Sequence, residues 1–144
     1  DVDIRYVGPE KPLTLQADET RLFEVLSNLL DNAIKFTERG TIMISAQASD
    51  DGREAIVKVI DSGSGIDPEI MPRLFTKFAT KSESGTGIGL YISKKIIEAH
   101  GGRIWAENNP DGRGATFAFA LQLLAQEAQD EDAMISKSAT PNQG

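Results

Sequence analysis

The sequence predicts an α/β protein, in which helices and β-strands share one hydrophobic core. Three observations support this fold class. Apolar residues recur at helical spacing over residues 18–37 and 88–100, runs rich in apolar and β-branched residues lie before and after these helices, and glycine-containing turns separate the runs. The chain has 144 residues, of which 40% are hydrophobic, and this suffices for one domain with a real core.

The first predicted elements are a short hairpin and a long helix. Residues 3–7 and 13–17 resemble two strands around the turn GPEKP, whose glycine and prolines favour a reversal of the chain. A helix is then expected from Asp18, a suitable N-cap, to about Thr37, before the stop signal of Arg39 and Gly40.

The later elements alternate between strands and helices. Two strands flank the turn DDGR, and they are followed by a short helix, a polar stretch typical of a mobile loop, a second long helix, two more strands and an acidic tail. The last strand is nearly all apolar and is therefore expected inside the sheet. In chain order these segments are residues 41–49, 54–61, 68–74, 79–87, 88–100, 103–108, 115–123 and 125–144, so that residues 1–124 form the predicted domain.

Charge and composition argue against several classes of function. A net charge of −7 disfavours nucleic-acid binding, so any anionic ligand must be held locally. The absence of cysteine excludes disulfides, thiolate zinc sites and cysteine nucleophiles, and it fits a reducing, cytoplasmic compartment. No apolar run approaches the roughly 20 residues of a membrane span, so no membrane contact is expected. Because the chain lacks an initiator methionine and a leader, we expect it to be a piece of a longer protein.

The first long helix carries two asparagines and a lysine at helical spacing. Leu22, Leu26, Leu29, Leu30, Ala33 and Ile34 are expected on one flank, and Glu24, Asn28, Asp31, Asn32 and Lys35 on the opposite one. An ordinary solvated face is the simpler interpretation. Asparagine is a mediocre helix former, however, and its amide oxygen can ligate a hard cation such as Mg²⁺. This face could therefore hold a metal together with the phosphates that it bridges.

Two glycine-rich segments give further candidates. In DSGSGI, Asp61 ends a strand, and either a tight turn or a carboxylate that accepts a hydrogen bond from an adenine amine fits the pattern. In GTGIGL, Gly85, Gly87 and Gly89 precede a helix, which fits either a flexible turn or a phosphate site at the helix N-terminus. Neither a dinucleotide fingerprint nor a P-loop is present.

Taken in order, these segments resemble the catalytic, ATP-binding domain of sensor histidine kinases, within the superfamily shared by gyrase, the DNA-mismatch-repair ATPase and the heat-shock chaperone. NLLDNAIKFT is similar to the N box, DSGSGI to the G1 box, LFTKF to the F box and GTGIGL to the G2 box. EAHGGRIWAEN and GRGATFAF resemble the segments that close that domain. The resemblance covers about residues 18–121.

The resemblance implies the Bergerat ATP-binding fold, a two-layer α/β (α+β) sandwich with a mixed β-sheet backed by helices. It implies ATP and Mg²⁺ as cofactors, with Asn32 as the metal ligand, Asn28 and Lys35 at the phosphates, and Asp61 on the adenine. These first three are the implied catalytic residues. The other implied nucleotide-binding residues are Gly63, Gly65, Ile66, Lys81, Gly85, Thr86, Gly87, Ile88, Gly89, Leu90 and Thr116.

Asn28 distinguishes this chain from its hydrolytic relatives. Gyrase-like ATPases have a glutamate at this place as the base for the attacking water, and an amide cannot accept that proton at neutral pH. We therefore expect an enzyme that presents the γ-phosphate of ATP to another group. The only histidine, His100, resembles a helix C-terminal residue beside Gly101 rather than a phosphoacceptor.

The resemblance also implies partners. The acceptor histidine is expected on a dimerisation domain of the same parent protein, upstream of Asp1, with the receiver domain of a response regulator as an indirect partner in a phosphorelay. The present chain should bind ATP without phosphorylating itself. A non-catalytic nucleotide-sensing module and an anti-sigma-type serine kinase remain open alternatives.

A few side chains near these motifs have simpler interpretations. Lys77 and Lys81 fit either solvent exposure or contact with a phosphate. Phe75 and Phe78 are expected to anchor the loop on the core, and Trp105 is expected in the core.

Overall fold

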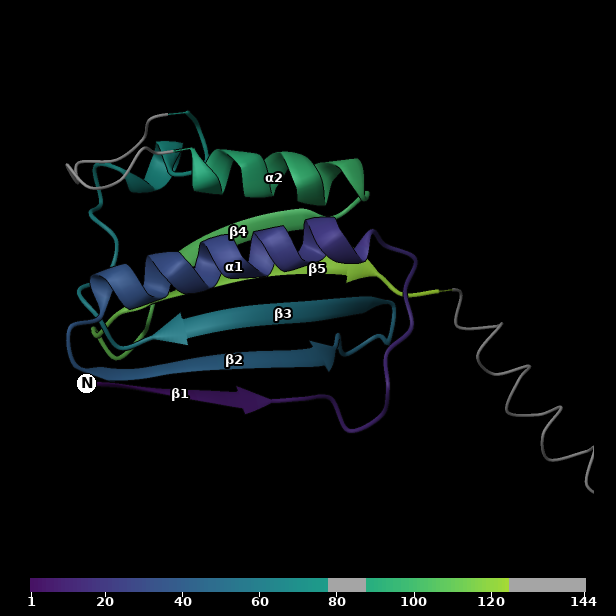
Figure 1. Ribbon diagram of the computed structural model, residues 1–144, viewed down its shortest axis with the longest axis horizontal. Helices are drawn as coiled ribbons and strands as arrows, with labels where there is room; N and C mark the ends of the chain where they lie inside the picture. Colours follow the sequence, from purple (N-terminus) through teal and green to yellow (C-terminus); the bar gives the residue numbers. More distant parts are fainter. Residues whose placement is uncertain (78–87, 125–144) are drawn as a thin grey trace, which may run out of the picture.

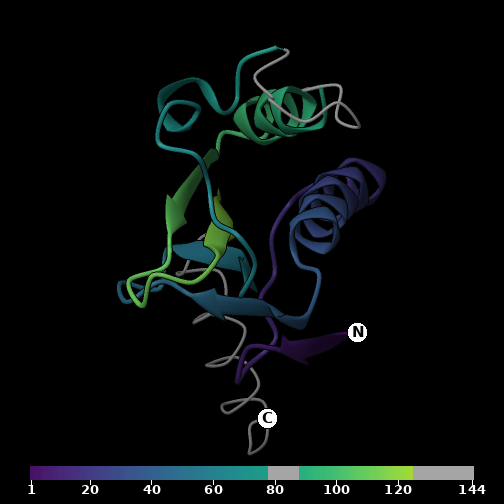
Figure 2. The same ribbon diagram turned by 90° about the vertical axis from the view of Figure 1, so that its left-hand side faces the viewer.

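The computed structural model describes residues 1–77 and 88–124, which form a five-stranded sheet with two α-helices on one face (Figures 1 and 2). This arrangement confirms the predicted two-layer α/β class with a mixed sheet. The predicted loop 79–87 and tail 125–144 lie outside the described residues. The elements are β1 (Val2–Val7), α1 (Glu19–Phe36), β2 (Gly40–Ala48), β3 (Glu54–Asp61), the 3-10 helix η1 (Met71–Arg73), α2 (Gly89–Ala99), β4 (Arg103–Asn108) and β5 (Ala115–Gln122).

The strands are arranged in the order β1-β2-β3-β5-β4. β1 runs parallel to β2, with Val2 opposite Gly40, and the other pairs are antiparallel. The apolar strand β5 lies between β3 and β4, with Phe117 opposite Val59, so the predicted interior position is confirmed. Asp61 is the last residue of β3, and this topology places it beside the first residues of β5.

The predicted N-terminal hairpin is wrong. β1 pairs in parallel with β2, and a parallel pair needs a crossover, which α1 supplies here. Residues 13–17 form no strand; instead they lead from β1 to α1, and the Thr14 carbonyl accepts a hydrogen bond from the Leu124 amide at 2.9 Å. The alternation in LTLQA reflects Leu15, which packs against the core from this crossover segment.

The core lies between the sheet and the two helices. α1 contributes Val25, Leu29 and Ala33, and α2 contributes Ile97, all of them essentially inaccessible. They pack against alternate residues of β3 and β5, namely Val59, Ala115, Phe117, Phe119 and Leu121. Because side chains alternate along a strand, Thr116, Ala118 and Ala120 lie on the other face of the sheet.

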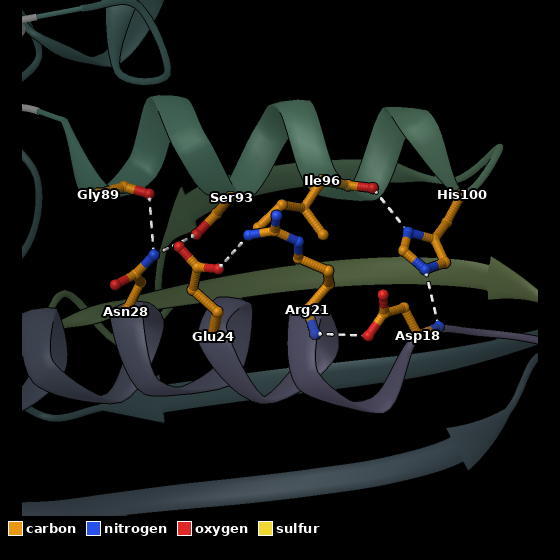
Figure 3. A network of polar contacts seen from close by, with 8 residues as sticks. All are labelled: Asp18, Arg21, Glu24, Asn28, Gly89, Ser93, Ile96 and His100. Atoms are coloured by element: carbon orange, nitrogen blue, oxygen red, sulfur yellow. Dashed lines mark hydrogen bonds and ion pairs between the residues drawn. The ribbon is translucent and has the colours of Figure 1, made fainter.

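The sequence had suggested that the polar and apolar flanks of α1 lie on opposite sides of the helix. The structure does not place them opposite each other. The buried line runs through Val25, Leu29 and Ala33, whereas Ile34 is 44% exposed and Asn28 and Asn32 are not on the buried line. The reason is that α1 is covered on two adjacent sides, by the sheet and by α2, which runs antiparallel to it (Figures 1 and 3). Asn28 lies on the second of these sides, and Asn32 follows it by one helical turn.

Candidate functional site

Asp61 has one carboxylate oxygen fixed by the backbone and one left free. The residue is only 4% exposed, and its Oδ1 accepts hydrogen bonds from the amides of Gly63 at 2.9 Å and Ala115 at 3.2 Å. Within the described ranges, Oδ2 accepts no hydrogen bond, and it is not among the fully buried atoms that lack a partner. The carboxylate therefore presents one oriented acceptor to any donor that approaches the end of β3.

The turn that follows Asp61 is held from the end of β4. Asn108 Oδ1 accepts from the Ile66 amide at 2.7 Å, and its Nδ2 donates to the Ile66 carbonyl at 3.1 Å. Next to this pair of bonds lies Gly65, whose φ of +83° favours glycine, and a Cβ there would meet Asn108 Oδ1 at 3.0 Å. The paired bonds hold Ile66, and the bond from the Gly63 amide to Asp61 Oδ1 holds the start of the same turn beside the carboxylate.

Asn109 makes a second clamp. Its Nδ2 donates to the carbonyls of Asp61 and Arg113, both at 2.8 Å, and its Oδ1 accepts from the Thr116 hydroxyl at 2.6 Å. Thr116, on the sheet face away from the helices, is thus engaged by Asn109 and is not brought to the Asp61 carboxylate. Ala115, one residue earlier, contacts Asp61 in its place.

Sequence reasoning missed both clamping residues. The available signal was the pair of amides at the end of the strand RIWAENN, directly before the turn PDG. Asparagine at a strand end often bonds to nearby backbone, so the two amides indicated a turn. The bond between Asn108 and Ile66, 42 residues earlier in the chain, could not be predicted from a local pattern.

The C-terminal end of α1 contacts the same turn. The Ser64 amide donates to the Phe36 carbonyl at 3.2 Å, and a Cβ on Gly63 would overlap that carbonyl oxygen. The hydroxyl of Thr37, a residue only 2% exposed, is the one fully buried side-chain polar atom in residues 1–77 and 88–124 that lacks a hydrogen bond. Because Phe36 makes the contact with this turn and Asn32 precedes Phe36 by four residues in α1, Asn32 lies one helical turn from the backbone that frames Asp61.

Asn28 is bound to the first turns of α2. Its Nδ2 donates to the Gly89 carbonyl at 3.3 Å and to the Ser93 hydroxyl at 3.2 Å, as Figure 3 shows. The start of α2, which follows the GTGIGL motif, is thereby joined to the asparagine-bearing side of α1. Ser93 is completely buried, and sequence reasoning had not identified it.

The asparagines suit a magnesium ion that is completed by phosphates. In the described part of the chain no group of three or more His, Cys, Asp or Glu side chains could hold a metal, so a cage made only of such side chains is absent there. Mg²⁺ commonly takes one or two protein oxygens and fills its shell with phosphate and water. Asn28 Oδ1 and the Asn32 amide make no side-chain hydrogen bond to other described residues. Asn28 faces the start of α2, and Asn32 follows one turn later on the same side of α1.

The remaining predicted site residues divide into two groups. Lys35 is exposed, with its ammonium 5.8 Å from the Phe36 ring centroid, while Ile88, Gly89 and Leu90 form the start of α2. Lys81, Gly85, Thr86 and Gly87 lie outside the described residues, as does Phe78.

Three nearby side chains have other surroundings. Lys77 places its ammonium 5.1 Å from the Tyr91 ring centroid. Phe75 packs edge-on against Phe117 at 6.4 Å, which confirms the predicted anchor on the core. Trp105 is half-buried on the outer face of the sheet, with the Arg103 guanidinium 4.6 Å from its ring centroid, so its predicted place in the core is wrong.

His100 ends α2, as predicted, and ties it to the start of α1. Its Nδ1 is 2.8 Å from the Ile96 carbonyl, and its Nε2 accepts from the Asp18 amide at 3.1 Å (Figure 3). Since Nε2 is an acceptor here, the neutral ring donates from Nδ1. A groove between the helices, lined by Arg21, Ile92, Lys95, Ile96, Ala99 and His100, also lies at this end, and none of the predicted site residues lines it.

Replacement of His100 by alanine should destabilise the fold without affecting the site. Two hydrogen bonds are lost, so we expect the free energy of unfolding to fall by about 1 to 2 kcal/mol in urea denaturation. Glu98→Ala is the control, since it removes only an exposed ion pair with Lys94 at 4.0 Å and should cost under about 0.5 kcal/mol. Equal losses of unfolding free energy in the two variants would contradict a stabilising role for the His100 hydrogen bonds.

Comparison with known proteins places these features in a family. The model of the "Histidine kinase-, DNA gyrase B-, and HSP90-like ATPase" family matches residues 17–125. Sensor protein FixL of Bradyrhizobium diazoefficiens is 43% identical over 126 residues, which cover 84% of this chain and 24% of FixL. Sensor histidine kinase ZraS of Salmonella typhimurium is 39% identical over 128 residues, covering 88% of this chain and 27% of ZraS. The chain therefore spans about a quarter of the length of these relatives.

Solved structures give the same relationship. Full-length ShkA in complex with AMPPNP aligns with a TM-score of 0.75 and 34% identity, covering 85% of this chain and 26% of ShkA. The nucleotide-free catalytic domain of histidine kinase ThkA aligns with a TM-score of 0.73 and 36% identity, covering 84% of this chain and 80% of that domain. In a complex of ThkA with the response regulator protein TrrA, the corresponding values are 0.70, 35%, 84% and 34%.

Neither described α-helix has the length and apolar character required to cross a membrane.

Proposed function

Because the chain belongs to the family of histidine kinase-, DNA gyrase B- and HSP90-like ATPases, we propose that it is the ATP-binding catalytic domain of a two-component sensor histidine kinase. Its activity is to bind Mg-ATP and to present the γ-phosphate to a histidine on a dimerisation domain of the parent protein. The two sensor proteins that it resembles, and the ThkA catalytic domain, support this choice within the family.

The geometry of Asp61 is the observation that carries the nucleotide assignment. One oxygen is held by two backbone amides, so the other points to a ligand in one direction only. The exocyclic amine of adenine is a donor that pairs with this acceptor, whereas guanine presents a carbonyl oxygen at the same edge and would be repelled. Gly63 and Gly65 allow the tight turn that holds this carboxylate in place, since a Cβ on Gly63 would overlap the Phe36 carbonyl oxygen and one on Gly65 would lie 3.0 Å from Asn108 Oδ1.

The phosphate end of the nucleotide is assigned to α1 and the start of α2. When bound, Mg²⁺ neutralises the charge that accumulates on the transferred phosphate. Asn32 supplies an amide oxygen toward it, Lys35 contributes a positive charge one turn later, and Gly89 begins a helix whose free N–H groups favour an anion. Lys81, Gly85, Thr86, Gly87, Ile88 and Leu90 belong to the same proposal.

Asn28 favours transfer over hydrolysis. It occupies the position of the water-activating glutamate in gyrase-like enzymes, and an amide whose nitrogen is bonded to Gly89 and Ser93 cannot remove a proton from water. The acceptor histidine is not His100, because both of its ring nitrogens are engaged at the far end of α2. We therefore assign the acceptor histidine to the dimerisation domain. The proposal also names the receiver domain of a response regulator as the next recipient of the phosphate, and the cytoplasm as the place where the domain acts.

The test is transfer of labelled phosphate in the presence of the parent protein's dimerisation domain. With γ-labelled ATP and Mg²⁺ we expect that domain to become labelled, with the acid lability of a phosphohistidine, and we expect the 144-residue chain alone to remain unlabelled. Asn32→Ala should reduce the labelling strongly, while Asp111→Ala, in the exposed turn after β4, should not.

Each alternative gives a different result in the same assay. Acid-stable label would indicate an anti-sigma-type serine kinase. Binding of Mg-ATP without any label on the dimerisation domain would indicate a nucleotide-sensing module. Failure to bind Mg-ATP in calorimetry would overturn the proposed function altogether.

A further inference from the structure

We propose that Ser93 is a positioning residue, which together with the Gly89 carbonyl holds the Asn28 amide so that its oxygen faces the bound nucleotide. This inference rests on the proposed function, and it names the part that α2 plays in it. The contacts that carry it are those of Asn28 Nδ2 with the Gly89 carbonyl at 3.3 Å and the Ser93 hydroxyl at 3.2 Å.

The orientation of the Asn28 amide follows from its partners. An asparagine amide nitrogen has two hydrogens, and here each has its own acceptor on α2. Rotation of the amide by 180° would bring Oδ1 against the Gly89 carbonyl oxygen, and two acceptors repel each other. The Gly89 carbonyl thus selects one of the two orientations, and Ser93 supports the same one.

Ser93 is well placed for this role. It is completely buried at the contact between α1 and α2, one turn after Gly89 on the same side of the helix. The neighbouring apolar residue Ile97, one turn further on, is also inaccessible and belongs to the core. A hydroxyl at a buried position must be hydrogen-bonded to offset its desolvation, and Asn28 meets this need.

The consequence is chemical. With both hydrogens committed to α2, Asn28 offers only an acceptor to the nucleotide, and an acceptor does not bind phosphate oxygens. It can ligate a hard cation or accept a hydrogen bond from a water of the cation's shell. The contacts therefore assign Asn28 to the magnesium side of Mg-ATP, whereas the family resemblance implied a place at the phosphates.

A matched pair of substitutions tests this assignment. Ser93→Thr and Ser93→Val add nearly the same volume at one buried site and differ in the hydroxyl, so their comparison isolates the hydrogen bond. Calorimetry on the 144-residue chain would give the dissociation constant for ATP with Mg²⁺ and with EDTA. We expect Ser93→Val to bind Mg-ATP about two- to tenfold more weakly than Ser93→Thr, with equal affinities in EDTA. Ser93→Ala, which cannot overpack the core, serves if the valine variant fails to fold.

Two further readouts separate positioning from general packing. In an Asn28→Ala background, the difference between the threonine and valine variants should disappear, since the two residues act as one unit. In ¹⁵N-resolved spectra, the Asn28 side-chain amide protons should shift in Ser93→Val and keep their positions in Ser93→Thr. The inference is overturned if the two variants have the same magnesium preference, or if the valine variant weakens ATP equally with Mg²⁺ and with EDTA. Loss of the proposed function would be recognised separately, because the unsubstituted chain would then fail to bind Mg-ATP.

Discussion

Asp61→Asn should lower the affinity for Mg-ATP by about 10- to 100-fold, the effect of losing one hydrogen bond to a charged group. The oxygen of the introduced amide would keep the two backbone donors, Gly63 and Ala115, and the amide nitrogen would then lie where the free carboxylate oxygen is now. A donor would then face the donor amine of adenine. Calorimetric titration with Mg-ATP measures the loss directly.

A second acid-to-amide substitution provides the control for charge. Asp51→Asn, in the exposed turn between β2 and β3, changes the net charge equally and should leave nucleotide affinity unaltered. The stability of the Asp61→Asn variant should also change little, since the two backbone bonds are retained. If the Asp61→Asn variant bound Mg-ATP as tightly as the unsubstituted chain, adenine would not be recognised at the end of β3.

Gly114→Ala should be strongly destabilising, because two unfavourable effects combine at this position next to the site. Its φ is +77°, and a Cβ there would overlap the Asp61 carbonyl oxygen and lie 2.8 Å from Asp61 Oδ1. The left-handed backbone and the overpacking together should cost about 2 to 5 kcal/mol of unfolding free energy. Because the displaced group is Asp61, affinity for Mg-ATP should fall as well.

Gly112→Ala separates these two effects. Gly112 has a φ of +82° in the same turn, but a Cβ on it would meet nothing within 4 Å. It should therefore carry only the backbone cost, about 1 to 2 kcal/mol, and retain nucleotide affinity. Urea denaturation and calorimetry on the two variants would measure both quantities. Equal losses at the two glycines would mean that contact with Asp61 is not the cause.

Local patterns predicted the helices and most strands because those signals are local. The apolar periodicity of α1, its Asp18 cap and the turn between β2 and β3 are each specified within a few residues, and the Arg21 amide indeed bonds Asp18 Oδ1 at 3.2 Å. The parallel pairing of β1 is different, since it depends on a crossover that sequence alternation in LTLQA does not encode. The local pattern favoured a hairpin between neighbouring segments, but β1 pairs instead with β2, which follows α1 in the chain.

The site divides in the same way. Motifs predicted Asp61 and Asn32 as candidate site residues, but the contacts around them span long sequence separations. Asn109 donates to the Asp61 carbonyl, and the Ser93 hydroxyl accepts from Asn28 Nδ2. Thr116 shows the limit of motif positions, since one step along a strand reverses the direction of a side chain and directs this hydroxyl to Asn109. Which of two adjacent residues meets the carboxylate is settled by strand register, and register is a property of the whole sheet.

The carboxylate of Asp61 is oriented by Ala115, 54 residues later in the chain. No fragment of the domain that lacks either strand can assemble this acceptor, so the nucleotide has nothing to recognise in an unfolded or partly folded chain. A ligand with that selectivity adds its binding free energy to the folded state alone. Under the proposed function, cellular ATP would therefore stabilise the folded domain before any phosphate is transferred.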